Sequence, residues 1–327
     1  MMSHIPAFAP LVLDPAAEVE RISQWLREKL RLDLRKRGLV LGLSGGIDSS
    51  LCAALAAKAL SAKNVFALYM PENDSDPESL RLGRAVAETF GIDSTLEDIG
   101  PALAAMGCYA RRDSAIREAV PEYGDGWASK IVFDSTMTTG GYNISSLVVR
   151  TPDGEMRKVR LPASAYLGIV AATNMKQRSR KQLEYYHADR LNFAVLGTPN
   201  RLEYDQGFFV KNGDGAADIK PIAHLYKSQV YQLAAHLGVP AEILSRPPTT
   251  DTYSLPQTQE EFYFALPYDK MDICLYGLNH GLPAETIAAA TGLSSSQVEL
   301  VWADITAKRK VARYLHCAPL VMDEPIG

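Results

Sequence analysis

The chain has 327 residues, with 34 basic and 38 acidic side chains, a formal net charge of −4 and 47% apolar residues. This length suits one large domain, and the acidic balance argues against a surface for duplex nucleic acid. The 4 cysteines form no Cys-x-x-Cys pair, and no apolar run reaches the roughly 18 residues of a membrane span. Because the N-terminus has no signal-peptide pattern, the sequence predicts a cytoplasmic protein.

Strand and helix patterns alternate through the first hundred residues. In chain order they predict a helix over 15–37, a strand over 39–44, a helix over 48–60, a strand over 64–70, a helix over 76–91 and a weaker strand over 93–99. Such alternation predicts an α/β fold with a doubly wound parallel sheet. Ligands in these folds bind at the carboxyl ends of the strands.

Residues 107–162 break this rhythm. The stretch 144–162 has a Pro-Asp-Gly turn between two strand patterns and predicts a β-hairpin, so we interpret 107–162 as an insertion. A long helix over 163–190, a strand over 192–198 and further helices, including a helical C-terminal part over 266–315, are predicted after it. The predicted organisation is a single domain over residues 1–327.

The stretch "VLGLSGGIDSS", residues 40–50, allows two interpretations. As Gly-x-Ser-x-Gly it fits a turn that carries Ser44 as a nucleophile. That chemistry needs an acidic partner and a histidine, and most candidate histidines fall in helical patterns: His187, His224, His236, His280 and His316. Ser44 also follows what is predicted to be the first strand of the sheet, whereas several strands usually precede such a nucleophile. The nucleophile interpretation is therefore disfavoured.

The second interpretation is a phosphate-binding turn. Gly45 and Gly46 carry no β-carbon, so backbone N–H groups can converge on phosphate oxygens. Ser44 and Ser49 add hydroxyl groups, and the helix that follows directs its positive end at the anion. Asp48 would repel phosphates unless a divalent cation lay between them, which makes it a candidate Mg²⁺ ligand.

The motif "SGGIDSS" resembles the pyrophosphate loop of the Rossmann-like N-type ATP pyrophosphatases. Four later motifs look specifically like those of the NAD synthetases: "NMKQRSR" (174–180), "LGTPNRLE" (196–203), "GFFVKNGDGAADIKPIAHLYKSQV" (207–230) and "RPPTTD" (246–251). The resemblance covers roughly 15–100 and 163–315. It implies that the carboxylate of deamido-NAD attacks ATP to give an acyl adenylate and pyrophosphate. Ammonia then displaces AMP and yields NAD.

The resemblance also implies roles for individual residues. The implied ATP site comprises Gly42, Leu43, Ser44, Gly45, Gly46, Ile47, Asp48, Ser49, Thr198, Lys227 and Thr249. Asp48 and Glu203 are the implied Mg²⁺ ligands, and Asp48 and Lys227 the implied catalytic residues. The implied dinucleotide contacts are Arg178, Lys211, Asp218 and Lys308. Without the resemblance, Lys176, Arg178, Arg180 and Lys181 could be a solvated helix face.

Two features depart from the family pattern. Ala307 stands where a histidine is expected before Lys308, and the insertion over 107–162 is unexplained. A paralogous amide ligase that adenylates a different carboxylate is therefore an alternative. The resemblance further implies a homodimer. Because 327 residues leave no room for a glutaminase domain, free ammonia is the expected nitrogen donor, with a separate glutaminase as a possible partner.

A remote alternative belongs to another class of protein. The segment 283–305 resembles a helix-turn-helix, which would suit a nucleotide-sensing DNA-binding regulator. Its second helix, however, carries Glu299 and Asp304 and has no basic residue before Lys308. Since affinity for DNA depends on cationic contacts to phosphate, a helical hairpin packed on the protein is favoured.

Overall fold

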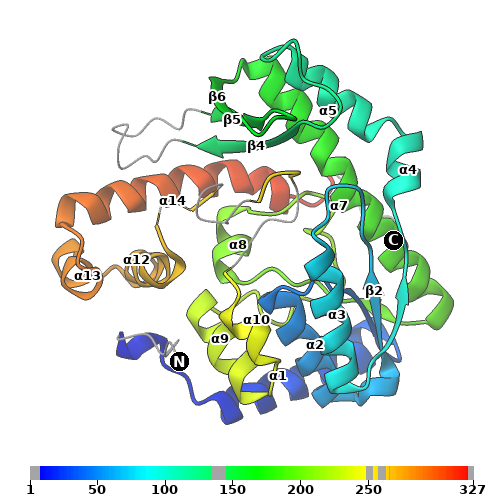
Figure 1. Cartoon of the computed structure of the whole chain (residues 1–327). Coiled ribbons are helices and arrows are strands. Elements are labelled where there is room, and N and C mark those ends of the chain that lie inside the picture. Colours follow the sequence, from blue (N-terminus) through cyan, green and yellow to red (C-terminus); the bar gives the residue numbers. More distant parts are fainter. Residues whose placement is uncertain (1–7, 134–144, 248–252, 257–262, 265, 323–327) are drawn as a thin grey trace.

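The computed structural model describes residues 8–133, 145–247, 253–256, 263–264 and 266–322, and within them a parallel sheet forms the centre of the molecule (Figure 1). Its strand order is β3 (Asp93–Leu96), β2 (Val65–Tyr69), β1 (Leu39–Gly42) and β7 (Ala194–Val195). Every neighbouring pair is parallel. The predicted strands are all present, although the outer one, over 192–198, is regular for only two residues.

Different helices cover the two faces of this sheet. Since successive side chains on a strand point to opposite faces, neighbouring residues of β1 belong to different cores. Leu39 and Leu41 of β1 share a core with α1 (Pro15–Lys29), α2 (Ile47–Leu60) and α3 (Pro77–Phe90). Val40, between them, belongs to a second core with α4 (Gly100–Ala105) and α7 (Ala163–Leu191). The predicted doubly wound arrangement is confirmed.

The helix predicted over 15–37 is shorter than its apolar pattern suggests. It begins after Asp14, whose carboxylate accepts two backbone N–H groups at 3.1 Å, and continues from α1 into a π-helical turn, Leu30–Leu34. Arg35 ends the turn with a left-handed backbone, φ 52°. The last predicted turn is therefore an ordinary connection to β1.

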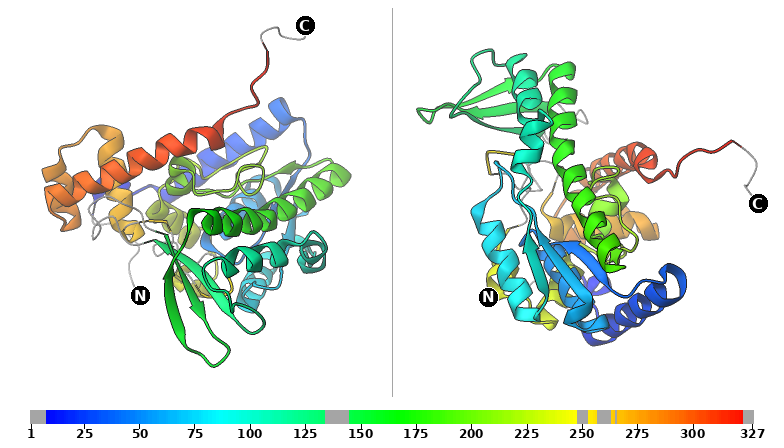
Figure 2. Two further views of the ribbon diagram at one scale, coloured as in Figure 1. Left: turned by 90° about the horizontal axis from the view of Figure 1, so that it is seen from above. Right: turned by 90° about the vertical axis from the view of Figure 1, so that its right-hand side faces the viewer.

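The region 107–162 contains more regular structure than the hairpin alone. The predicted hairpin is β5 (Ser145–Arg150) with β6 (Met156–Arg160), and β4 (Ala128–Phe133) pairs with β5 as an additional strand. The helix α5 (Cys108–Arg117) was also not predicted; it packs along the first half of α7. Figure 2 shows this small sheet at the amino-terminal end of α7, away from the central sheet.

The C-terminal part is helical, as predicted. Helices α12 (Tyr268–His280), α13 (Ala284–Thr291) and α14 (Ser295–His316) form most of a separate core, which Leu11, Leu202 and Tyr226 also join. Val298 and Val301 of α14 are buried in it, so the segment that resembles a helix-turn-helix packs as a structural unit. Shorter helices α8 (Arg201–Gln206), α9 (Lys227–His236) and α10 (Ala241–Ser245) connect these parts. None of the helices in the described residues has the length and apolar character needed to cross a membrane.

Candidate functional site

A cavity of about 920 Å³ opens at the carboxyl ends of the central strands. Its wall is built from the turn between β1 and α2, the loop after β2, helices α7 and α8, the loop over 207–212 and the end of α14. This volume lies in the range of pockets that hold small organic ligands. The place agrees with the general rule for parallel sheets.

The turn between β1 and α2 is shaped by its glycines. Gly45 has a left-handed backbone, φ 71°, and a β-carbon at this position would lie 2.6 Å from the backbone oxygen of Ser79 at the start of α3. A side chain is excluded both by strain and by space. The turn therefore packs tightly on α3 while its other side faces the cavity.

The hydroxyl groups of this turn bind one another and the backbone. The Ser44 and Ser49 hydroxyl oxygens lie 3.1 Å apart, and Ser44 Oγ accepts the N–H of Gly46 at 3.3 Å. Of the histidines in the described residues, none lines the cavity. The nucleophile interpretation of Ser44 thus has no support in the described part of the chain, whereas the open start of α2 suits an anion.

Two carboxylates of the cavity wall are joined by Asn200. The Asn200 side-chain amide donates to Asp48 Oδ1 at 2.9 Å, and its backbone N–H donates to Glu203 Oε2 at 3.1 Å. Glu203 and Asn200 form a capping box at the start of α8, which fixes both side chains. Asp48 from α2 and Glu203 from α8, predicted as a pair, are thereby held side by side.

Lys227 is the cation of this cluster. It is the first residue of α9, its side chain is 2% exposed, and its ammonium group donates to Asp48 Oδ2. Burial by itself would lower the pKa of Lys227, but the carboxylates of Asp48 and Glu203 outweigh burial and raise it. The lysine is therefore charged at neutral pH and lies beside the predicted phosphate turn.

The start of α9 is held by Asp272 of α12. The Asp272 carboxylate is fully buried and accepts the backbone N–H groups of Lys227 at 3.1 Å and Ser228 at 2.7 Å. These are N–H groups that a helix start leaves without partners. Asp272 thus fixes the backbone from which Lys227 reaches Asp48.

We predict that Asp272 makes stability depend on pH. Burial raises the pKa of Asp272 to about 7, although the N–H donors oppose this, and the unfolded value is about 3.9. A group with a raised folded pKa stabilises the protein fully below its unfolded pKa and loses that contribution as pH rises through its folded pKa. Urea unfolding of wild type and Asp272→Asn between pH 4 and 7.5 should therefore show the stability of wild type decreasing relative to that of the variant as pH rises. A stability difference that does not change with pH would contradict the assignment.

Arg178 and Lys211 lie together on another side of the cavity. Arg178 Nε donates to the backbone oxygen of Lys211 at 3.2 Å, and Lys211 Nζ donates to the backbone oxygen of Tyr314 at 2.8 Å. Both side chains line the cavity, as does Thr198 at the end of the β7 segment. The structure brings these three predicted residues to the same cavity as the phosphate turn.

Two of the predicted dinucleotide contacts lie elsewhere. Asp218 does not line the cavity; its carboxylate accepts the N–H of Val195 at 2.7 Å and the hydroxyl of Tyr185 at 3.3 Å. Lys308 lies within the helical C-terminal part, where its ammonium group donates to Asp304 at 2.6 Å. Their roles stay predictions, and Thr249 lies outside the described residues.

The basic residues of 176–181 are not a uniformly solvated helix face. Lys176 is 1% exposed and Lys181 5% exposed, so that interpretation is wrong for both. Lys181 lines the cavity and pairs with Glu184 at 2.6 Å. Arg178, by contrast, is exposed at the cavity mouth.

The residues present fit a magnesium ion. Within the described residues no group of three or more His, Cys, Asp or Glu side chains forms a protein-only metal cage. Mg²⁺ is ordinarily held by one or two carboxylates together with phosphates and water, so a pair of carboxylates beside a phosphate turn is the expected donor set. Asp48 and Glu203 supply that pair.

Sequence reasoning missed Asn200 and Asp272. For Asn200 a signal was present, because "NRLE" places Asn three residues before Glu, the composition of a capping box. For Asp272 there was none, since it lies in an amphipathic helix 44 residues after Ser228 in the chain. Only the packing of α12 on α9 brings it to the site.

The Rossmann-like sheet and the glycine turn after its first strand make this a nucleotide-binding protein, of the class of ATP pyrophosphatases that the motifs indicate. A family model described as NAD synthase matches residues 18–120 and 137–312. The chain belongs to the NAD synthase family.

Curated relatives agree with this membership. The chain is 72% identical over 309 residues to an NH(3)-dependent NAD(+) synthetase of Rhizobium meliloti, covering 94% of this chain and 92% of the relative. It is 34% identical over 260 residues to the protein of the same name from Thermotoga neapolitana, covering 79% and 83%.

Solved structures show the same fold. An NMN synthetase from Francisella tularensis aligns with a TM-score of 0.67 and 22% identity over 96% of this chain and all of that one. An NH3-dependent NAD synthetase from Campylobacter jejuni aligns with a TM-score of 0.62 and 23% identity over 95% of this chain and all of that one.

Proposed function

We propose that this protein is an ammonia-dependent NAD synthetase, a ligase that forms a C–N bond. It converts deamido-NAD, ATP and ammonia into NAD, AMP and pyrophosphate through an acyl adenylate. The observation that carries the proposal is 72% identity over almost the whole chain to a curated protein of that name. The cavity supports it, because the predicted phosphate turn, acids and basic residues converge there.

The chemistry assigned to the site is mainly positioning and charge neutralisation. A carboxylate is a poor electrophile, and adenylation gives it AMP as a leaving group. As the bond between the α and β phosphates breaks, negative charge grows on the departing pyrophosphate. The N–H groups of the turn after β1 and the Lys227 ammonium group lie where they can stabilise that charge.

The proposed metal is Mg²⁺, held by Asp48 and Glu203. When bound, it supplies a Lewis acid that neutralises phosphate oxygens and orients them for in-line displacement. Asn200 keeps both carboxylates in place through its two hydrogen bonds. On the far side of the cavity, Arg178 and Lys211 are proposed to hold the anionic groups of the dinucleotide.

The decisive assay mixes the protein with ATP, Mg²⁺, ammonium and deamido-NAD and follows NAD, AMP and pyrophosphate. Equal amounts of the three products are expected, and no NAD without ammonium. If AMP appears only with a different carboxylate, the chain is the paralogous ligase instead. Neither that alternative nor the DNA-binding regulator is favoured, given the high identity to NAD synthetases and the packing of 283–305.

We also propose that the protein forms a homodimer. A separate glutaminase partner and a cytoplasmic location stay predictions. Several large apolar side chains on α1, its π-helical extension and α7 are exposed to solvent: Trp25, Leu32, Leu167 and Tyr186. Apolar exposure of this kind supports association between copies. Light scattering after size exclusion should give twice the mass of 35.8 kDa.

A further inference from the structure

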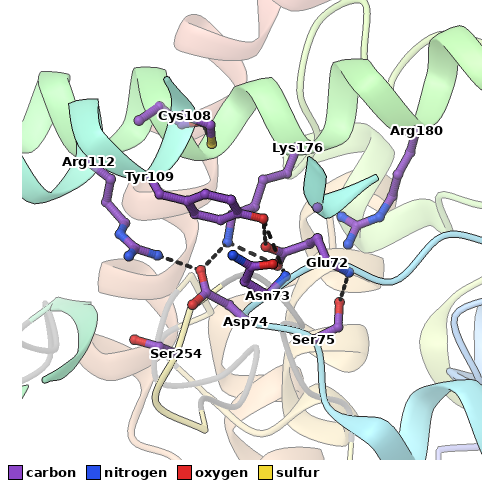
Figure 3. A network of polar contacts seen from close by, with 12 residues as sticks. Glu72, Asn73, Asp74, Ser75, Cys108, Tyr109, Arg112, Lys176, Arg180 and Ser254 are labelled. Carbon is purple, nitrogen blue, oxygen red and sulfur yellow. Dashed lines mark hydrogen bonds and ion pairs between the residues drawn. The ribbon is translucent and has the colours of Figure 1, made fainter. Parts of the chain in front are cut away.

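A cluster of buried charges lies beside the cavity, and the proposed chemistry makes no use of it (Figure 3). At its centre is Lys176 of α7, 1% exposed. Its ammonium group donates to Glu72 Oε1 at 3.0 Å and to Asp74 Oδ2 at 2.6 Å. Both acids belong to the loop that leaves β2, so one lysine of α7 binds two carboxylates of one loop.

The same two carboxylates are also held by α5. Arg112 donates to Asp74 Oδ2 at 2.5 Å, and the Tyr109 hydroxyl donates to Glu72 Oε2 at 2.9 Å. Figure 3 shows Tyr109 and Arg112 reaching the loop on one side of Lys176, and Arg180 on the other. The loop is thereby fixed to two helices, α7 and α5, and the residues matched by the NAD synthase model include both.

The positions of the basic residues on α7 explain this arrangement. Lys176 and Arg180 are four residues apart, roughly 40° around the helix, so they face the same loop. Arg180 Nε donates to the backbone oxygen of Met70, at the start of that loop, at 3.1 Å. Arg178 lies roughly 200° from Lys176 and binds the opposite wall at Lys211.

The fixed loop borders the ATP side of the cavity. Glu72, Ser75 and Asp76 belong to the cavity wall, and the loop leads into α3. The first turn of α3 carries Ser79, whose backbone oxygen packs on Gly45 of the phosphate turn. A shift of the loop would therefore move the support of the phosphate turn itself.

We propose that Lys176, Arg112 and Tyr109 are positioning residues that hold the loop over 70–77 against the ATP site, and that α5 is thus a part of this site's support. None of the three lines the cavity, so they act through the loop and not by touching substrate. A buried lysine between the buried Glu72 and the part-buried Asp74 suits this role, because loss of one partner leaves the others uncompensated. The inference rests on the proposed function.

The test is steady-state kinetics of full-length Lys176→Met with ATP, Mg²⁺, ammonium and deamido-NAD. The KM for ATP should rise roughly tenfold or more, with kcat and the KM for deamido-NAD each changing less than about threefold. Lys176→Arg keeps the charge and should recover part of the loss. Tyr109→Phe and Arg112→Met should shift the KM for ATP in the same direction and by less.

The matched control is Arg157→Met. Like Arg112, Arg157 belongs to the region 107–162 and has two carboxylate partners, Glu122 at 3.0 Å and Glu155 at 2.9 Å. Unlike Arg112, its side chain is 43% exposed. It should leave all kinetic constants unchanged. If Lys176→Met does not fold, Tyr109→Phe and Arg112→Met decide the question.

Two results would overturn the inference. One is an unchanged KM for ATP in folded variants of Lys176, Tyr109 and Arg112. The other is a lower kcat with an unchanged KM for ATP, because that result would mean only that a smaller fraction of the enzyme is folded. Failure of the proposed function is distinguishable, since wild-type protein would then form no NAD. Calorimetric titration of ATP into wild type and variants would still measure the positioning effect.

Discussion

Asp48→Asn is expected to lower kcat/KM by roughly a thousandfold. The substitution keeps the shape of the side chain but removes a charged Mg²⁺ ligand at the phosphate turn. It also leaves Lys227, 2% exposed, without the carboxylate to which its ammonium group donates. Because Asp48 itself is 16% exposed, we expect a moderate destabilisation of about 2 kcal/mol.

The assay is NAD formation across a Mg²⁺ series, with thermal unfolding in parallel. Asp205→Asn is the matched control: Asp205 lies two residues after Glu203 in α8, and its ion pair with Arg309 at 2.8 Å joins side chains 26% and 31% exposed. That control should retain wild-type kcat/KM. Full activity of Asp48→Asn in folded protein would remove Asp48 from both the metal site and the catalytic group.

Lys227→Met is expected to lower kcat by roughly a hundredfold or more, with a smaller change in the KM for ATP. Methionine fills nearly the same volume but supplies no charge as pyrophosphate departs. Without the lysine, Asp48 and Glu203, joined through Asn200, repel each other in a part-buried site. The variant should therefore be less stable than the wild type in the absence of divalent cations.

Mg²⁺ distinguishes this explanation from a general packing defect. Addition of Mg²⁺ should raise the Tm of Lys227→Met by more than it raises the Tm of wild type, because the cation replaces the missing positive charge. Arg309→Met, the other half of the control ion pair, should show the wild-type response. A kcat within threefold of wild type would show that Lys227 is not catalytic.

Most of the fold could be predicted from local sequence patterns. The apolar strands β1 and β2, the helix α3 and the 29-residue α7 follow from short apolar runs and from helical periodicity, and all are present where expected. The strand β4 was missed because turn-like residues precede it and because it is recognised only by its pairing with β5, the next strand in the chain. A strand of this kind is defined by pairing, which a local pattern does not contain.

The residues of the candidate site also fall into a group that the sequence predicts and a group that it does not. Residues of continuous motifs, such as Asp48, Glu203 and Lys227, were predicted from sequence, and in the structure they form one cluster of contacts. Residues that act by reaching across from another element were not. Asp272 and Lys176 read as ordinary helix positions until tertiary packing shows which buried partner each one meets.

The helix α7 restricts where insertions and deletions can occur in this sequence. Lys176 and Arg180 contact the loop over 70–77, whereas Arg178 contacts Lys211 on the opposite wall. Each residue added to or removed from the helix rotates everything beyond it by roughly 100°. One deletion between the small sheet and Lys176 would turn the lysine away from its loop. The spacing within "NMKQRSR" is therefore fixed by the angle around the helix as strictly as by composition.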